Sequence, residues 1–285
     1  MFKQCCFALA ICTTAISGCY AKDATEWRKL SLDNTVLLTL PQGKVVIELA
    51  PQFSPKHVNQ FKSLVEKRFY DGEKFYRVID GFVAQAGPED GSEKDKSVSI
   101  LPIEDEWSID ESWQFTPVQQ NDLFAPTTGF KEGFAIGHDA SAKKAWLTHC
   151  PGVIAMARNN EPNSATSHFY IVNGQAPRYL DRIMTIFGRV VYGMNHVQAI
   201  TRTAGIEGDP KVNGDDYTPI VSMQLMKDVL PKDRILIEVE STESKAFADK
   251  LAKRKLREPA FFYKKPPPVL DICQTPVKSR LVTAG

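Results

Sequence analysis

The stretch FYRVIDGFVAQAG, residues 75–87, decides most of what this sequence says about its fold. It predicts two short apolar strands joined by a tight turn at Asp80-Gly81, because Asp-Gly between apolar runs is a strong hairpin signal. Arg77 lies inside the first strand, and Phe82 and Gln85 interrupt the small residues of the second. An arginine within an apolar strand is costly to bury unless its guanidinium has a partner. Arg77 is therefore either an edge-strand residue that points to water or a paired group at a functional site.

Four more motifs follow farther along the chain. They are GVIAMAR (152–158), PNSATSHFYI (162–171), YLD (179–181) and IFGRV (186–190). Together with residues 75–87, and in this order, they resemble the cyclophilin family of peptidyl-prolyl cis-trans isomerases, in particular its bacterial members. The resemblance covers residues 35–227 with one large insertion. Each motif alone is a weak signal, whereas the ordered set is specific to the family.

The resemblance implies a mainly β fold, a closed eight-stranded antiparallel barrel capped by two helices, over residues 35–227. Closing the sheet removes exposed strand edges. The residues themselves point the same way, since 35–40 and 45–49 read as a hairpin and Ser54-Pro55 is an arrangement favoured at helix N-termini. The apolar residues of that helix recur at helical spacing, at Val58, Phe61, Leu64 and Val65.

By the same resemblance the chain accelerates rotation about Xaa-Pro bonds, with Arg77 as the residue that donates to the prolyl nitrogen. Phe82 and Gln85 complete the implied catalytic group, and Gln85 steadies the arginine. No bond breaks in this reaction, so neither a cofactor nor a metal is expected. The resemblance also places a set of substrate-binding residues around the pocket and groove: Val83, Met156, Ala157, His168, Tyr170, Tyr179, Leu180 and Met184.

Several of these positions depart from the family pattern. His168 stands where glutamine is usual, Met184 where many members have histidine, and Tyr170 replaces a phenylalanine and adds a hydroxyl that needs a partner or water. The departures leave a second function open, a weakly catalytic or non-catalytic chaperone module that binds proline-containing peptides. A third possibility is a purely structural role for the protein, in which replacement of Arg77 changes neither peptide binding nor catalysis. The partners expected of an isomerase are proline-containing peptides and unfolded exported proteins.

The first residues predict export. Residues 5–16 form an apolar segment that is too short to span a bilayer, and Lys3 precedes it, so residues 1–18 read as a signal peptide. Residues 16–19 resemble a bacterial lipobox, which implies that Cys19 is lipidated and anchors the protein to a membrane. Ordinary cleavage near Cys19, which releases a periplasmic protein, is the alternative. Tyr20 in place of aspartate favours the outer membrane, and residues 19–34 form the predicted tether.

The whole chain has an ordinary globular composition, with 43% hydrophobic and 24% charged residues among 285. Its net charge of +1 supplies no basic field for nucleic-acid binding. The five histidines show no metal-ligand spacing with cysteines or acids. Cys150 and Cys273 remain after the N-terminal cysteines, and in an oxidising compartment they are candidates for one disulfide. Their separation in space and the oligomeric state stay open.

Two segments lie outside the family pattern. The insertion, residues 88–151, has ten acidic residues and two lysines between positions 89 and 122. Aromatic residues among these acids, such as Trp107 and Trp113, indicate packing on the barrel, and the position of the insertion makes it a candidate for control of substrate access. The C-terminal extension, residues 228–285, has eight basic and two acidic residues between positions 245 and 265. That basic run is either a solvated helix face or a surface for an anionic membrane.

Overall fold

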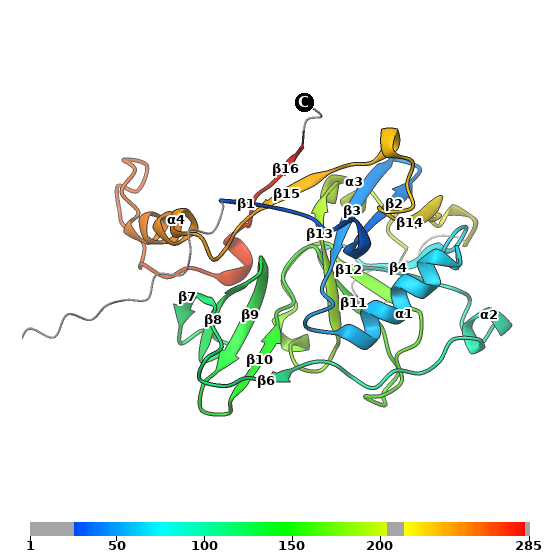
Figure 1. Ribbon diagram of the computed structural model, residues 1–285, viewed down its shortest axis with the longest axis horizontal. Helices are drawn as coiled ribbons and strands as arrows, with labels where there is room; N and C mark the ends of the chain where they lie inside the picture. The colour runs from blue at the N-terminus through cyan, green and yellow to red at the C-terminus, as the bar shows by residue number, and fades with distance from the viewer. Residues whose placement is uncertain (1–25, 204–213, 283–285) are drawn as a thin grey trace, which may run out of the picture.

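The computed structural model describes residues 26–203 and 214–282. The largest of the three sheets in this described part is antiparallel and has eight strands in the order β14-β2-β3-β13-β11-β12-β5-β4. It forms the curled sheet on the right of Figure 1. Its strands are β2 (Thr35–Leu40), β3 (Gly43–Leu49), β4 (Lys74–Val78), β5 (Val83–Gly87), β11 (Val153–Met156), β12 (Phe169–Val172), β13 (Ile186–Tyr192) and β14 (Ser222–Leu225).

Two helices pack on the curled sheet, as expected. Helix α1 (Pro55–Glu66) has proline at its first position and contacts β13 and β14. The face predicted from its spacing, including Val58 and Phe61, is buried in the same apolar cluster as the inner face of the sheet. The shorter helix α3 (Met194–Gln198) contacts β3. Burial of these apolar faces is the dominant favourable contribution to the stability of the fold.

The expected eight antiparallel strands are confirmed, but full closure of the barrel is not. The edge strands β4 and β14 share no ladder with each other. A single bridge joins Lys74 to Pro219 across the junction, and the Phe75 amide donates to the Thr218 carbonyl at 3.0 Å. Proline has no amide hydrogen to donate, so Pro219 limits a regular ladder here. The sheet is therefore a curled half-barrel with a bridged junction.

The hairpin of residues 75–87 forms as predicted, with one difference in its turn. Gly81 has φ +69°, a left-handed conformation that suits glycine, and the Ile79 amide donates to the Val83 carbonyl at 2.9 Å. The second strand begins at Val83, so Phe82 belongs to the turn. A β-bulge between Lys74 and Arg77 also interrupts the first strand.

The insertion folds into a second antiparallel sheet with the strand order β6-β10-β9-β8-β7. Aromatic contacts show that this sheet packs on the barrel. The ring centroid of Phe53, which lies between β3 and α1, is 4.7 Å from that of Trp107 and 5.6 Å from that of Phe134 in the insertion. A short helix, α2 (Glu93–Lys96), precedes this sheet. The strands are β6 (Trp107–Ser108), β7 (Thr116–Gln120), β8 (Thr127–Lys131), β9 (Phe134–Asp139) and β10 (Lys144–Leu147).

The first and last strands of the described part flank β15 in a third sheet, which consists of β1 (Trp27–Lys29), β15 (Ile237–Glu240) and β16 (Ser279–Leu281). Residues 27–29, which were expected in a tether, are therefore part of the fold because they pair with the C-terminal extension. Helix α4 (Lys245–Leu256) follows β15 and is capped by Ser244, whose hydroxyl accepts from the Phe247 amide.

Short 3-10 helices connect these elements: Leu32–Asn34, Arg178–Leu180, Gly214–Asp216, Pro231–Asp233 and Ile272–Gln274. The predicted signal peptide and Cys19 lie outside the described residues. Within the described part, no helix combines the length and the apolar character needed to cross a bilayer.

Candidate active site

The strand register places the key polar residues in one row on the outer face of the curled sheet. Arg77 in β4 pairs with Gln85 in β5, Gln85 pairs with Tyr170 in β12, and Tyr170 pairs with Ala155 in β11. Residues directly opposite each other on paired strands project from the same face. The inner face carries their neighbours in sequence, such as Phe169, which belong to the barrel core.

Arg77 is half-buried and has two partners. Its Nη1 donates to Gln85 Oε1 at 3.3 Å, and its Cζ lies 5.7 Å from the centroid of the Phe82 ring. The contact with an aromatic face is favourable for a guanidinium. Although β4 is an edge strand, Arg77 does not simply point to water, so the structure favours the second interpretation of this residue.

A chain of hydrogen bonds also holds the Gln85 side chain. Gln85 Nε2 donates to Tyr76 Oη at 2.6 Å, and Tyr76 Oη lies 2.8 Å from His168 Nδ1. Burial raises the pKa of Tyr76 to about 12, so its phenol stays protonated near neutral pH and donates to His168 Nδ1. His168 then carries its proton on Nε2, which lies 3.2 Å from Asp95 Oδ1.

Sequence reasoning missed the roles of Tyr76 and Asp95. Strict strand alternation predicts that Tyr76 and Arg77 point to opposite faces. The β-bulge between Lys74 and Arg77 adds one residue to β4 and brings both side chains to the same side. Asp95 lies in α2 of the insertion, and no local pattern connects it with His168.

A cavity of about 570 Å³ opens beside this network. Two of the predicted substrate-binding residues, Ala157 and His168, lie in its wall, and the Ala157 amide donates to the His168 carbonyl at 2.8 Å. Cations and carboxylates both contribute to its polar lining. The lining residues are Tyr76, Arg77, Gln85, Asp90, Gly91, Asp95, Ala157, Arg158, Asn159, Ser164, Thr166 and His168.

The predicted apolar walls lie next to the polar row. Val83 and Tyr170 are buried in one cluster, and Phe82, Ala157 and Met184 pack against it as partly buried residues. This arrangement brings five of the predicted residues together. Leu180 is half-buried and Tyr179 is 64% exposed, both in the 3-10 helix Arg178–Leu180.

Met156 is not part of this pocket. It pairs with Phe169 across β11 and β12, is 1% exposed, and belongs to the barrel core. Neighbouring residues on a strand face opposite sides, so Met156 and Ala157 do not both line the groove. The prediction that Met156 forms a pocket wall is therefore wrong.

The Tyr170 hydroxyl has a protein partner. Tyr170 Oη lies 2.9 Å from His149 Nε2, while His149 Nδ1 lies 3.0 Å from Asp181 Oδ1. Burial raises the pKa of Tyr170 far above its usual range, so the phenol donates to Nε2 and Nδ1–H donates to the carboxylate. The ring of Tyr170 thus presents an apolar surface, and its polar end is satisfied by His149.

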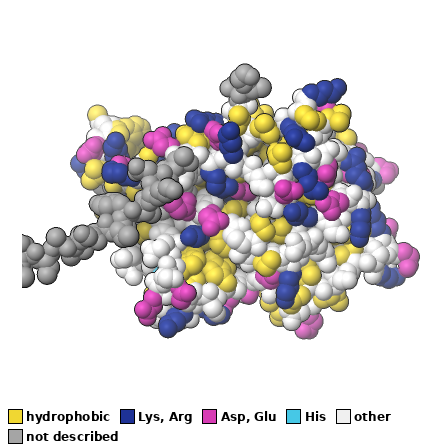
Figure 2. All heavy atoms as spheres, viewed as in Figure 1, with side chains coloured by type: hydrophobic (Ala, Val, Ile, Leu, Met, Phe, Trp, Pro, Cys, Tyr) yellow, Lys and Arg dark blue, Asp and Glu magenta, His cyan; other side chains and the backbone are white. Residues whose placement is uncertain are grey.

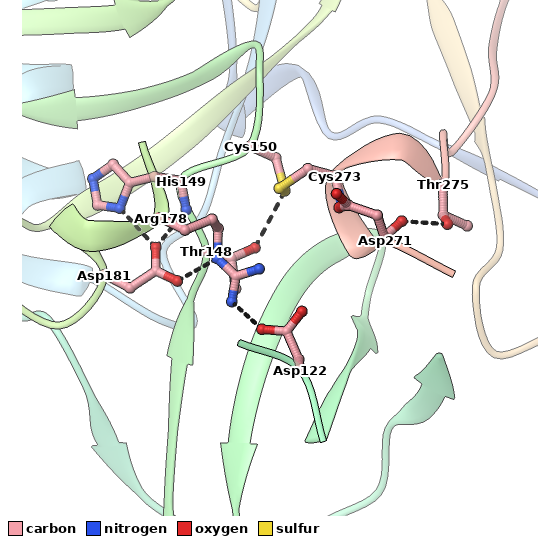
Figure 3. The surroundings of a disulfide bond; sticks show 9 residues. All are labelled: Asp122, Thr148, His149, Cys150, Arg178, Asp181, Asp271, Cys273 and Thr275. Carbon is pink, nitrogen blue, oxygen red and sulfur yellow. Dashed lines mark hydrogen bonds and ion pairs between the residues drawn. A yellow bond between two sulfur atoms is a disulfide. The ribbon is translucent and has the colours of Figure 1, made fainter. Parts of the chain in front are cut away.

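Figure 3 shows that this network continues into the insertion and lies beside a disulfide. Arg178 bonds Asp181 and also pairs with Asp122 Oδ1 at 3.0 Å, where Asp122 follows strand β7. Cys150, the residue after His149, is disulfide-bonded to Cys273, with 4.8 Å between their Cα atoms. The insertion, the pocket wall and the C-terminal extension therefore meet at one place.

One group in the described part of the chain approaches a metal-ligand set. Single ligand atoms of Asp90, Asp95 and His168 lie within 4.8 Å of one another. Both ring nitrogens of His168 already have hydrogen-bond partners, Tyr76 and Asp95. Acting as a metal ligand, His168 would have to give up one of these bonds, so we treat the group as a hydrogen-bonded network.

The comparisons with known proteins agree on one family. The family model for cyclophilin type peptidyl-prolyl cis-trans isomerase/CLD matches residues 35–224. A protein named probable peptidyl-prolyl cis-trans isomerase from Brucella suis is 34% identical over 183 residues, which cover 64% of this chain and 79% of that protein. The peptidyl-prolyl cis-trans isomerase cyp18 of Streptomyces antibioticus is 30% identical over 176 residues, which cover 59% of this chain and 82% of that protein.

A solved structure is similar over a longer stretch. The crystal structure of cyclophilin AquaCyp293 from Hirschia baltica has a TM-score of 0.70 and 28% sequence identity, and the match covers 90% of this chain and 93% of that one. Because so little of the chain is left uncovered, the similarity includes part of the C-terminal extension as well as the eight-stranded sheet.

Proposed function

The chain belongs to the cyclophilin family of peptidyl-prolyl cis-trans isomerases, and we propose that it uses this activity on proteins exported to the periplasm. The observation that carries the proposed mechanism is the position of Arg77. Its guanidinium is held by Gln85 and lies over Phe82, at the border between the polar cavity and the apolar cluster. A donor is thereby fixed where a proline ring on the apolar side presents its nitrogen.

The reaction requires the enzyme to favour a twisted amide. Resonance gives the peptide bond partial double-bond character and a rotation barrier of roughly 18–20 kcal/mol. In the twisted state the prolyl nitrogen becomes pyramidal and gains a lone pair. A guanidinium that donates to this nitrogen binds the twisted state better than either planar form, and this difference in binding lowers the barrier.

The remaining residues have supporting roles in this mechanism. The cavity beside Arg77 accepts the extended chain that precedes the proline, and the ring of Tyr170 with Val83 and Met184 forms the apolar wall for the pyrrolidine. His149 engages the Tyr170 hydroxyl, so no unpaired polar atom faces the proline. Tyr76 and His168 keep Gln85, and through it the guanidinium, in place.

The test is cis-trans exchange of a short Xaa-Pro peptide with the wild-type protein and with Arg77→Ala. Loss of one preorganised donor lowers catalysis by about 10²–10³-fold at comparable sites, and we expect a loss of this order with peptide affinity retained. Arg77→Lys should recover little, because an ammonium lacks the planar fork that Gln85 and Phe82 hold.

Arg202→Ala is the matched control, because Arg202 pairs with Asp80 at the turn of the same hairpin and lies outside the cavity. Its activity should equal that of the wild type. Peptide binding without acceleration in the wild type would favour the chaperone module, and full activity in Arg77→Ala would refute the assigned role of the arginine.

We further propose that the protein is anchored to the outer membrane through lipidated Cys19. The resemblance of residues 16–19 to a lipobox supports this, and a disulfide such as Cys150–Cys273 is typical of proteins outside the reducing cytosol. Cell fractionation with Cys19→Ser tests the proposal. The wild type should sediment with the outer membrane and the variant should not, and identical membrane association of both would refute lipid anchoring.

A further inference from the structure

The C-terminal extension contains a projecting lobe, residues 253–269, which we call the tail tip. It begins in the last turn of α4 and lies at the left of Figure 1, away from β4. Both ends of the lobe are fixed to the rest of the protein. The buried residue Leu251 precedes it, the buried residue Leu270 follows it, and Cys273 is disulfide-bonded to Cys150. The tail tip therefore projects from a packed, disulfide-linked part of the fold.

The tail tip exposes large apolar side chains. Phe261 is 84% exposed and Tyr263 is 87% exposed, and Leu256 and Val269 are also exposed. Prolines at 259 and 266–268 restrict the backbone between them. Clustered exposed apolar side chains on a soluble domain mark interaction sites. Their position on a projection favours contact with an extended surface.

The same lobe is basic. Between positions 253 and 269 there are six basic residues and one acid, Glu258. Arg254 and Arg257 donate to the backbone carbonyls of Gln274 and Val269, whereas the four lysines of the tip make no ion pair with any described carboxylate. Figure 2 shows hydrophobic and Lys or Arg side chains together on this lobe. Its lysines are therefore available to external anions.

We propose that the tail tip docks onto an anionic lipid bilayer. Aromatic rings settle at the headgroup level of a membrane, where Phe261 and Tyr263 would insert. Each lysine or arginine near an anionic surface strengthens binding by about fivefold. Rings and lysines on one projection, with a single acid among them, complement a flat anionic surface.

Docking through the tail tip leaves the cavity beside Arg77 free, because β4, which carries Arg77, lies on the right of Figure 1, whereas α4, where the tail tip begins, lies on the left. The interaction does not depend on Cys19, because it uses residues 253–269 alone. A lipid anchor and a basic surface together hold a protein on a membrane more stably than either one does. Docking by the tail tip also orients the unlipidated protein, with β4 on the side of the molecule away from the bilayer.

The experiment measures co-sedimentation with vesicles. It uses the chain from residue 20 onward, which contains every described residue and cannot be lipidated. We expect binding to vesicles that contain phosphatidylglycerol, weakened by salt, and little binding to vesicles of phosphatidylcholine alone. Lys264→Gln with Lys265→Gln should lower binding by about 25-fold, from the fivefold contribution of each charge. Phe261→Ser with Tyr263→Ser should also lower it.

The matched control is Leu230→Ser with Lys232→Gln, which removes an exposed leucine and an exposed lysine from another surface. This control should bind as the wild type does. All variants should retain wild-type isomerase activity, which shows that they are folded. Absence of binding to phosphatidylglycerol vesicles would overturn the proposal, as would equal binding by wild type and both tip variants. Salt-sensitive binding to RNA or an acidic protein, without vesicle binding, would assign the tip to another partner.

Discussion

Removal of the Cys150–Cys273 disulfide should destabilise the protein strongly without changing its folded structure. The bond joins residues 123 positions apart, so it closes a large loop in the unfolded chain. The chain-entropy treatment of such a loop gives a loss of about 5 kcal/mol in the free energy of unfolding at 25 °C. Domains of this kind have total stabilities of roughly 5–15 kcal/mol, so the loss is a large fraction of the whole.

The folded extension should nevertheless stay docked when the bond is absent. Leu270 and Ile272 are buried beside Cys273, and burial of an aliphatic side chain of this size contributes roughly 1.5–3 kcal/mol. The Leu270 amide also donates to Gln119 Oε1 of the inserted sheet at 3.1 Å. These contacts exist only in the folded state, whereas the disulfide restricts the unfolded state.

The assay is equilibrium unfolding in urea, followed by tryptophan fluorescence and far-UV circular dichroism, for wild type and for Cys150→Ala with Cys273→Ala. The midpoint should fall, the folded spectra should coincide, and the slope of free energy against urea should rise because the unlinked unfolded chain exposes more surface. Wild type in a reducing agent is the control and should match the variant. A loss below about 1 kcal/mol would refute the argument, which rests on the loop entropy.

Two further predictions concern buried side chains. Tyr170→Phe leaves His149 Nε2 without its donor, so the free energy of unfolding should fall by about 1–3 kcal/mol while isomerase activity stays within a few-fold, because the ring remains. Urea unfolding and the peptide assay together check this, and a large loss of activity at unchanged stability would contradict it. Burial lowers the pKa of His57 even though Glu104 lies 2.8 Å from its Nδ1. As pH falls below about 6.5, His57 therefore becomes protonated in the unfolded chain before it does so in the folded protein. The contribution of His57 to the free energy of unfolding is full above that pH and declines towards the lower pKa of the folded state. His57→Gln should reduce this decline in unfolding measured from pH 8 to pH 5, and an unchanged decline would exclude His57 as a cause.

The hairpin that holds Arg77 was predictable because its signals are local. An Asp-Gly pair between apolar runs requires a turn, and the turn sets the pairing of Arg77 with Gln85. The error at Met156 was avoidable on the same grounds, since alternation along a strand excludes a groove position for both Met156 and Ala157. The family resemblance supplied the residues, whereas the strand period decides which of them face the groove.

Other features had no local signal. The β-bulge that turns Tyr76 towards His168 depends on how β4 meets β5, and nothing in the residues around Tyr76 marks it. The disulfide stayed open for the same reason, because the distance between Cys150 and Cys273 depends on the path of the whole extension. The strands of the insertion are short, so its aromatic residues indicated packing on the barrel but no local pattern indicated a separate sheet.

The insertion is part of the pocket as well as a neighbour of it. Arg178 is buried, and a buried guanidinium is stable only with partners of opposite charge. It has two, Asp181 from its own segment and Asp122 from the insertion, 56 positions away in sequence. Asp181 in turn holds His149, which holds Tyr170. The insertion therefore helps to fix the pocket wall, and its residues Asp90, Gly91 and Asp95 also line the cavity beside Arg77 directly.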